Sequence, residues 1–439
     1  MVLDKLDMQR FSLRKTAKQL SYRMRYKAMS SHDQVNCRKW KKILQHLIII
    51  NHCRPKDKFI EEILPLAAMK YLSLAYEDPD FHEPLERPLR RVISVDSFTA
   101  SQCKIFFKFN KAELFRIFNL LQFPEDCKFD NGGSMSGEEV FLRGLYEACN
   151  SGNKQVICET IMGGECSRQS RAFIFFIEHI YDKFQHLVHN SLGWWYRNGL
   201  LQQSATAIYE KMVAAGFPRE LNLIFLIGLF VDCNCLPTSV VGGGPAEEGA
   251  NAARFDESVQ RAFYNGWKSI HGLKHQTIDT AHGITVEVYG PTSLRRNDLT
   301  LLRDSDINGR LADLQWDVVQ ELWLHIFGDS AYPELSHLHS YVKNRPDLTA
   351  EYQRKFNSAM KKVRISIEWN YGFTATLFKY LQDYSKLKLL ESPVVSKVYT
   401  VCTILRNFYA ILYGCQTSNY FNLTLPSDFL EAYIAQSDL

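Results

Sequence analysis

The sequence predicts an α/β protein in which a mixed sheet with packed helices follows an all-helical region. Short, continuous apolar runs of strand length, such as residues 223–231 and 322–327, lie in the C-terminal half and are typical of buried strands. Before residue 218, apolar residues recur instead at helical spacing, as in residues 168–186. We therefore expect three regions: residues 1–91, 92–218 and 219–439.

The composition indicates a folded protein that is neither secreted nor membrane-spanning. Hydrophobic residues make up 46% of the chain, which excludes a disordered protein. The longest apolar runs, residues 47–50 and 221–231, are shorter than the roughly 20 residues of a spanning helix. Eleven cysteines, an odd number without zinc-site spacing, favour a reducing compartment. The polar, basic residues 1–19 do not resemble a secretory signal.

The first region is basic although the whole chain carries a net charge of only +4. Residues 1–42 contain twelve Lys or Arg and three Asp, and four of these basic residues lie in the run Arg-Lys-Trp-Lys-Lys at 38–42. Such clustering predicts an arm that binds nucleic-acid phosphates. A solvated tail and a nuclear-import signal are open alternatives. We expect a nuclear protein in which the Pro-rich residues 78–91 form a linker.

The second region contains three helical segments with turns between them. The expected helices are residues 138–148, 154–162 and, after a capping Ser167, 168–186. This spacing suits a helix-turn-helix, in which the N-terminal residues of the third helix contact DNA bases. Arg168 and Arg171 are therefore candidate DNA-binding residues. The alternative is an ordinary helical bundle with exposed arginines.

The third region begins with strands. The run at 223–231 predicts a buried central strand that ends at Asp232. Residues 274–280 and 284–289 flank a His-Gly turn and predict a hairpin. The glycine-rich residues 240–251 lack the lysine of a phosphate-binding loop, so we interpret them as a flexible connection.

The rest of this region adds two helices and one more strand. A helix is expected to begin at Asp298, and a strand at 322–327 is followed by Asp329. Residues 349–384 predict a long helix that contains Glu368, four residues after Arg364. Strand, hairpin, helix, strand and helix, in this order, are the layout of an RNase H-like core.

Four carboxylates accompany these elements and suggest a metal site. Asp232, Asp298, Asp329 and Glu368 lie on separate segments that this fold brings together. Two divalent ions about 3.5 to 4 Å apart, held by hard oxygen ligands, activate water and stabilise the leaving oxygen in phosphodiester cleavage. Each acid also has a structural explanation: a cap or lysine partner for Asp232, the helix dipole for Asp298, a turn for Asp329 and an ion pair with Arg364 for Glu368. Their joint order favours the metal site.

Five segments in order resemble the PIF/Harbinger-type DDE transposases. The strand ending Val-Asp-Cys at 231–233 begins the series, and the turn Gly-Asp-Ser-Ala-Tyr-Pro at 328–333 is similar to the family's "GDsgYp". The other segments are Arg-Asn-Asp at 296–298 with Leu301, Leu302 and Ser305, similar to "HDS"; residues 364–372, similar to "R..vE..fG"; and Leu-Arg-Asn-Phe at 405–408, similar to "lhN". The resemblance covers residues 221–414.

The resemblance implies a cut-and-paste DNA transposase. It implies that Asp232, Asp298, Asp329 and Glu368 are the catalytic metal ligands, with Mg²⁺ or Mn²⁺ as the cofactor. It also implies DNA and a separate Myb-like DNA-binding protein as partners, whereas pairing with further copies of this chain stays open. The chain departs from the family where Cys-Asn-Cys at 233–235 replaces Gly-Thr-His and where Asn297 replaces histidine.

A basic and aromatic cluster precedes the predicted hairpin. Its members are Trp267, Lys268, His271, Lys274 and His275. Lys268 and Lys274 are candidate contacts for DNA phosphates, and the alternative is an amphipathic approach to a strand. For the whole chain, the competing function is a domesticated, catalytically silent nuclear DNA-binding or scaffold protein.

Overall fold

The computed structural model describes six stretches of the chain, and residues Pro88–Leu439 form one compact unit within it. The described residues are 93–130, 133–220, 226–239, 261–314, 324–389 and 392–436. The predicted basic arm, the linker and the glycine-rich connection lie outside them. Among the residues described, no helix combines the length and the apolar character needed to cross a membrane.

The helical region contains the expected helices and one small hairpin. Its helices are η2 (Val95–Ser97), α4 (Ala100–Phe107), α5 (Lys111–Leu121), α6 (Gly137–Cys149), α7 (Lys154–Ile157), the π-helix η3 (Cys158–Met162), α8 (Cys166–Phe184), η4 (Gln185–Val188), α9 (Leu192–Arg197) and α10 (Leu200–Ala214). The expectation of an all-helical region is wrong in one respect, because β1 (Asp126–Lys128) pairs with β2 (Ser134–Ser136). Strands of three residues are too short to give a periodic pattern. The expected cap at Ser167 is also wrong, because Glu165 precedes the first turn of α8.

The sheet has the mixed order expected of an RNase H-like core. Its strands are β3 (Leu226–Pro237), β4 (Tyr264–Asn265), β5 (Ile270–Thr280), β6 (Thr285–Ser293), β7 (Leu324–Phe327) and β8 (Leu338–His339). The spatial order is β6-β5-β3-β7-β8, with β4 pairing with the start of β5. β5 is antiparallel to β3 and β6, whereas β7 is parallel to β3 and β8 is parallel to β7. The predicted α/β core is confirmed.

The central strand is longer than predicted. β3 does not end at Asp232 but continues to Pro237, paired with β5 throughout. Residues 232–235 are half-buried, so an apolar run cannot reveal them as strand. Asp232 therefore lies within the strand and not at its end.

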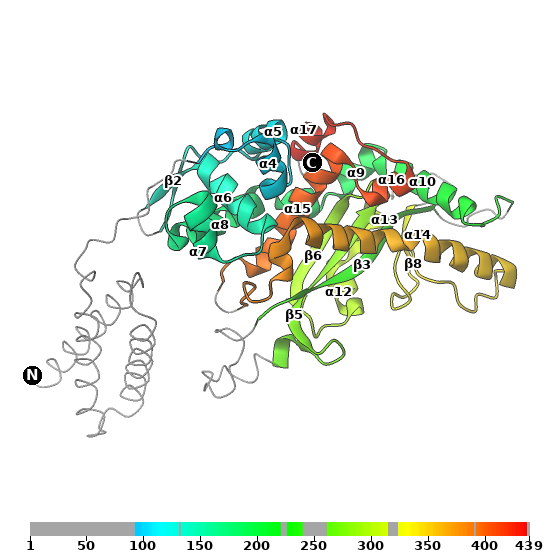
Figure 1. Ribbon diagram of the computed structural model, residues 1–439. Coiled ribbons are helices and arrows are strands. Elements are labelled where there is room, and N and C mark those ends of the chain that lie inside the picture. The colour runs from blue at the N-terminus through cyan, green and yellow to red at the C-terminus, as the bar shows by residue number, and fades with distance from the viewer. Residues whose placement is uncertain are drawn as a thin grey trace, which may run out of the picture. The chain divides into compact units, whose positions relative to one another are not determined.

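Helices cover both faces of the sheet. The later helices are α12 (Asp298–Ser305), α13 (Ile307–Leu314), α14 (Ala350–Leu377), η5 (Lys379–Gln382), α15 (Val395–Tyr413), α16 (Gln416–Phe421) and α17 (Phe429–Ile434). Phe230 of β3 belongs to one hydrophobic cluster with residues of α10 and α14. The next residue, Val231, belongs to the other cluster, with Leu302 of α12 and Ile307 of α13. Because successive side chains of a strand point to opposite faces, α14 and α12 lie on opposite sides of β3. Figure 1 shows α14 crossing the sheet.

Helix α15 joins the sheet to the helical region, as it contacts both β6 and α8. The family-like residue Asn407, for which the sequence assigns no role, makes this connection and is fully buried. Its amide oxygen accepts a hydrogen bond from the Thr285 backbone N–H at 3.1 Å, and its amide nitrogen donates to the Thr285 carbonyl at 2.8 Å. The same nitrogen donates to the Tyr433 hydroxyl of α17 at 2.8 Å. Asn407 thus supplies hydrogen-bond partners to the backbone of Thr285 at the start of β6 and holds α17 against it.

Replacing Asn407 by alanine is expected to lower the free energy of unfolding by about 2 kcal/mol, because a buried backbone N–H and carbonyl lose their partners. Asn357→Ala is the matched control. Asn357 bonds the backbone of Val342 in the same two-sided way, at 2.8 Å for both bonds, but is half-buried, so water can replace it. Urea unfolding measures both variants. If both variants lost the same free energy of unfolding, burial of Asn407 would not explain its larger expected effect.

Candidate metal centre

Asp232 lies on the face of β3 that α14 covers. Its carboxylate is 18% exposed. It accepts a hydrogen bond from the Cys233 backbone N–H at 2.7 Å. Burial raises the pKa of this carboxyl to about 6, against the lowering effect of Arg364, and the charges of Asp329 and Asp298 raise it further. The charges of two other predicted acids therefore act on Asp232.

Asp329 is the neighbour of Asp232 on the adjacent strand. β3 and β7 are parallel, and Phe230 of β3 pairs with Phe327 of β7. Asp232 and Asp329 each follow their member of this pair by two residues. Adjacent strands are about 4.8 Å apart, which places the two backbones side by side. Asp329 follows the end of β7, and its carboxylate accepts a hydrogen bond from the Ala331 backbone N–H at 2.8 Å. The predicted turn is present and leaves Asp329 half-buried.

Glu368 approaches from α14 together with Arg364. One nitrogen of the Arg364 guanidinium contacts the Asp232 carboxylate, and the other is 3.4 Å from the Glu368 carboxylate. Glu368 is 60% exposed at its side chain, whereas Arg364 is 12% exposed. Burial raises the pKa of Tyr341, and the charges of Asp329 and Glu368 raise it while Arg364 lowers it. Asp232, Asp329 and Glu368 therefore surround one region between β3, β7 and α14.

Tyr371, which lies in the family-like segment 364–372 but receives no role from the sequence, connects α14 to the sheet. Its hydroxyl is 2.8 Å from the Thr277 hydroxyl on β5, and Thr277 is level with Asp232 across the strand pair. Arg364, Glu368 and Tyr371 are four and three residues apart, so they share one face of the helix. The aromatic residue after a Glu-containing helix turn was the available signal.

Asp298 begins α12 on the opposite face of β3. Its carboxylate is 2.8 Å from the Lys274 ammonium, and the same ammonium donates to the Arg296 carbonyl at 2.6 Å. The side chain of Asn297, which stands where the family has histidine, accepts a hydrogen bond from the Thr300 backbone N–H at 2.8 Å and caps the helix. The substitution therefore supports the helix start that carries Asp298.

Tyr332 of the "GDsgYp"-like turn is a structural residue. It is buried, and its hydroxyl lies 3.5 Å from both the Cys233 sulfur and the Gln276 amide. A Cβ on Gly328 would meet the Tyr332 ring at 2.7 Å, so glycine is required for this packing. The turn thereby holds Asp329 next to the strand that carries Asp232.

The donor set has the chemistry of a divalent-metal site. Carboxylate oxygens from four segments of the chain are hard ligands suited to Mg²⁺ or Mn²⁺. As the side chains stand, no three His, Cys, Asp or Glu residues of the described chain converge closely enough to hold an ion. Arg364 and Lys274 instead neutralise two of the acids. The oxygen donors therefore suit a divalent ion by their kind, whereas in the arrangement described Arg364 and Lys274 are their counter-ions.

The basic and aromatic cluster divides between surface and core. Trp267 is 95% exposed, and Lys268 beside it is exposed, with its ammonium 3.0 Å from the Cys235 sulfur. Lys274 and His275 are buried, and the His275 ring lies against Tyr399 with 4.4 Å between ring centroids. Of the predicted DNA contacts in this cluster, Lys268 is the accessible one.

Arg168 and Arg171 lie at the start of α8, as the helix-turn-helix interpretation requires. Arg168 forms an ion pair with the buried Glu139 at 2.9 Å, and Arg171 lies over the ring of Phe129, with its guanidinium carbon 6.0 Å from the ring centroid. Both side chains are half-buried. Their DNA contacts stay a prediction, and Arg168 would have to leave Glu139 to make one.

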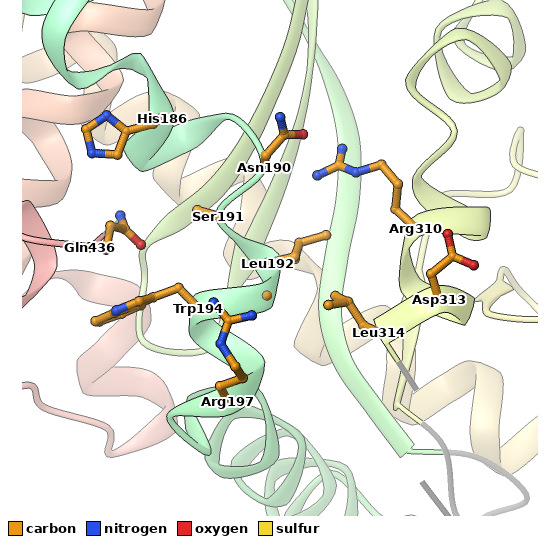
Figure 2. A pocket seen from close by; sticks show the side chains of 11 residues that line it. His186, Asn190, Ser191, Leu192, Trp194, Arg197, Arg310, Asp313, Leu314 and Gln436 are labelled. Carbon is orange, nitrogen blue, oxygen red and sulfur yellow. The ribbon is translucent and has the colours of Figure 1, made fainter. Parts of the chain in front are cut away.

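A cavity of about 350 Å³ lies elsewhere, between α9 and α13 (Figure 2). Leu192, Leu314 and Trp194 form its apolar part, whereas Arg197 and Arg310 supply positive charge. None of the four predicted carboxylates lines it. The cavity is therefore separate from the candidate metal centre.

Comparison with known proteins gives one match. Residues 252–407 match the family model described as DDE superfamily endonuclease. This stretch contains Asp298, Asp329 and Glu368, and Asp232 precedes it. No curated protein and no solved structure matches the chain significantly. Residues 252–407, which include β5, β6, β7 and α14 of the RNase H-like core described above, are thus similar to DDE superfamily endonucleases.

Proposed function

We propose that the protein is a metal-dependent DNA transposase of the PIF/Harbinger type. The observation that carries this proposal is that Arg364 of α14 joins Asp232 of β3 to Glu368, with Asp329 two residues after the end of the neighbouring parallel strand β7. Asp298, which the family resemblance adds to the proposed ligand set, lies on the other face of β3 and would have to leave Lys274 to reach the same ions. Divalent ions held by these oxygens would supply Lewis acidity toward the scissile phosphate.

The chain's own residues then have defined roles. The carboxylates position the attacking water and the phosphate, and the water oxygen bonds to phosphorus as the bond to the 3′ oxygen breaks. The 3′ oxygen leaves and takes up a proton released by the attacking water. In the second step this 3′ hydroxyl loses its proton as its oxygen bonds to a phosphorus of the target DNA, and the target strand's own 3′ oxygen leaves and is protonated. Lys268, at the exposed tip beside β5, is positioned to contact the DNA backbone. No covalent enzyme intermediate is needed, and the cysteine beside the site has its pKa raised by burial.

The test is cleavage of DNA that carries the element's ends. We expect nicking by the full chain with Mg²⁺ or Mn²⁺ and none with EDTA. A Myb-like DNA-binding protein, which the proposal includes as a partner, is added in parallel reactions, and nuclear location is checked by imaging the tagged protein. A chain that binds these ends but never nicks them, with the partner and metal present, would establish the silent DNA-binding function instead.

That second function has an observation in its favour. Arg364 and Lys274 form ion pairs with Asp232 and Asp298, so two of the four acids have counter-ions within the chain itself. A silent descendant would keep the sheet and the DNA-binding surface and lose metal affinity. Metal titration therefore separates the two functions even where the cognate DNA is unknown.

DNA affinity is expected to depend strongly on the basic residues 1–42. A chain beginning at Pro88, where the compact unit starts, should bind DNA more weakly and with a shallower dependence on salt, because fewer counterions are released. Gel shifts at two salt concentrations measure this. Equal affinity and equal salt slope for the full and shortened chains would locate the DNA surface in residues 88–439.

A further inference from the structure

Arg364 holds two of the proposed metal ligands at once, and this arrangement points to a role beyond a helix ion pair. Its guanidinium contacts Asp232, which is 132 residues away in sequence, and lies 3.4 Å from Glu368 one helical turn on. Asp232 is largely buried and close to the charges of Asp329 and Asp298. A buried carboxylate among like charges requires a cation. Arg364 is the cation that the described residues supply.

Arg364 has fewer hydrogen-bond partners than Arg143, a buried arginine with a structural role, and can therefore exchange its partners more easily. Arg143 is 1% exposed and donates to Glu139, Gln169 and the carbonyls of Met162 and Gly163 at 2.8 to 3.3 Å. Arg364 contacts only the two carboxylates, and its buried Nε has no hydrogen-bond partner. One of these carboxylates, Glu368, is mostly exposed.

Lys274 gives a second contrast within the site. Its ammonium is buried and bonded both to Asp298 and to a backbone carbonyl. Removing the ammonium would leave that carbonyl without this hydrogen bond. Arg364 has no backbone acceptor among the bonds described for it. Its long side chain can therefore rotate away from the sheet toward the side of α14 on which Glu368 is exposed. A guanidinium released there would match a phosphate, which it binds in a two-pronged geometry.

We propose that Arg364 is an exchangeable counter-ion of the carboxylate site. It neutralises Asp232 and Glu368 until a divalent cation takes their oxygens, and the released guanidinium then pairs with the DNA phosphate. Arg364 is thus a positioning residue that couples metal binding to DNA binding. The inference rests on the proposed function, since it assumes that these carboxylates bind metal.

The first experiment is calorimetric titration of the full chain with Mn²⁺ alone. Arg364→Ala should bind Mn²⁺ roughly tenfold more tightly than the unchanged protein, because the competing cation is gone. The matched control is Arg345→Ala. Arg345 also joins two carboxylates, Glu334 and Asp347, but outside the site, so its loss should leave Mn²⁺ affinity unchanged. Asp232→Asn should weaken binding.

The second experiment measures DNA binding by gel shift, with Ca²⁺ or with EDTA. Arg364→Ala should lose roughly tenfold in DNA affinity with Ca²⁺ and nothing with EDTA, where the guanidinium of the unchanged protein is still held by the carboxylates. If Arg364 only added positive charge, its loss would weaken DNA binding equally with Ca²⁺ and with EDTA. Arg364→Gln, which keeps the length of the side chain, repeats both measurements if the alanine variant does not fold.

The outcomes separate the two proposals. If Asp232→Asn weakens Mn²⁺ binding but neither Arg364 variant tightens it, the metal centre stands and the counter-ion role is refuted. If neither the unchanged chain nor the Arg364 variants bind Mn²⁺, the proposed nuclease function fails and the counter-ion role fails with it. Tighter Mn²⁺ binding together with a metal-dependent loss of DNA affinity supports the exchange.

Discussion

Replacing Asp232, Asp329 or Glu368 by alanine is expected to reduce Mg²⁺- or Mn²⁺-dependent DNA nicking by on the order of 10⁴, the scale on which members of one catalytic unit act. In the proposed site each of these carboxylates would share in holding the same ions, so losing one would displace the reacting phosphate. DNA binding through the basic arm should be unaffected. Initial rates on a supercoiled plasmid carrying the element's ends measure the loss.

Two comparisons make this result specific. Glu334→Ala removes a half-exposed acid that pairs with Arg345 outside the site and should nick normally. Asp298→Ala should lose less activity than the other three, because its carboxylate is held by Lys274 and its position at a helix start has an independent structural reason. Normal nicking by the Asp232 or Glu368 variant would show that the metal is held elsewhere.

Two buried histidines are expected to make the fold sensitive to acid. Burial lowers the pKa of His275 to about 3 and that of His282 to about 4, and no ring nitrogen of either has a hydrogen-bond partner. In the unfolded chain, histidine titrates near pH 6.5. Both side chains therefore stay neutral in the folded protein at a pH where the unfolded chain takes up protons.

The sign follows from this proton uptake. The stability that the neutral histidines confer is fully present above pH 6.5 and is lost as the pH falls toward their folded pKa values. Between pH 8 and pH 5 each contributes a loss of about 2 kcal/mol in the free energy of unfolding, and the pair about 4 kcal/mol. Urea unfolding at several pH values measures it.

The control is the variant with both histidines replaced by leucine, which should lack this part of the pH dependence. Each single replacement should remove about half of it. A pH profile unchanged by the double replacement would show that water or a partner group satisfies the two rings, so that burial does not depress their pKa values.

The sequence alone was enough for the order of the main elements. Apolar runs of strand length predicted β7 and most of β3, a His-Gly turn predicted the β5–β6 hairpin, and helical spacing predicted α6, α8 and α14. These signals are local, because a buried strand or an amphipathic helix repeats its apolar residues within its own length. The same sequence also contained the family-like segments, and Asp298, Asp329 and Glu368 lie in the stretch that matches a DDE endonuclease family.

Only the tertiary structure decided which charges meet. The sequence shows Arg364 four residues from Glu368, but not that it reaches Asp232, because the strand register and the docking of α14 by Tyr371 set that contact. It shows Lys274 in a basic cluster, but not that Asp298 and a backbone carbonyl hold it. Side chains far apart in the chain have no common periodic pattern. Their pairing depends on which faces of the sheet and its helices are buried together.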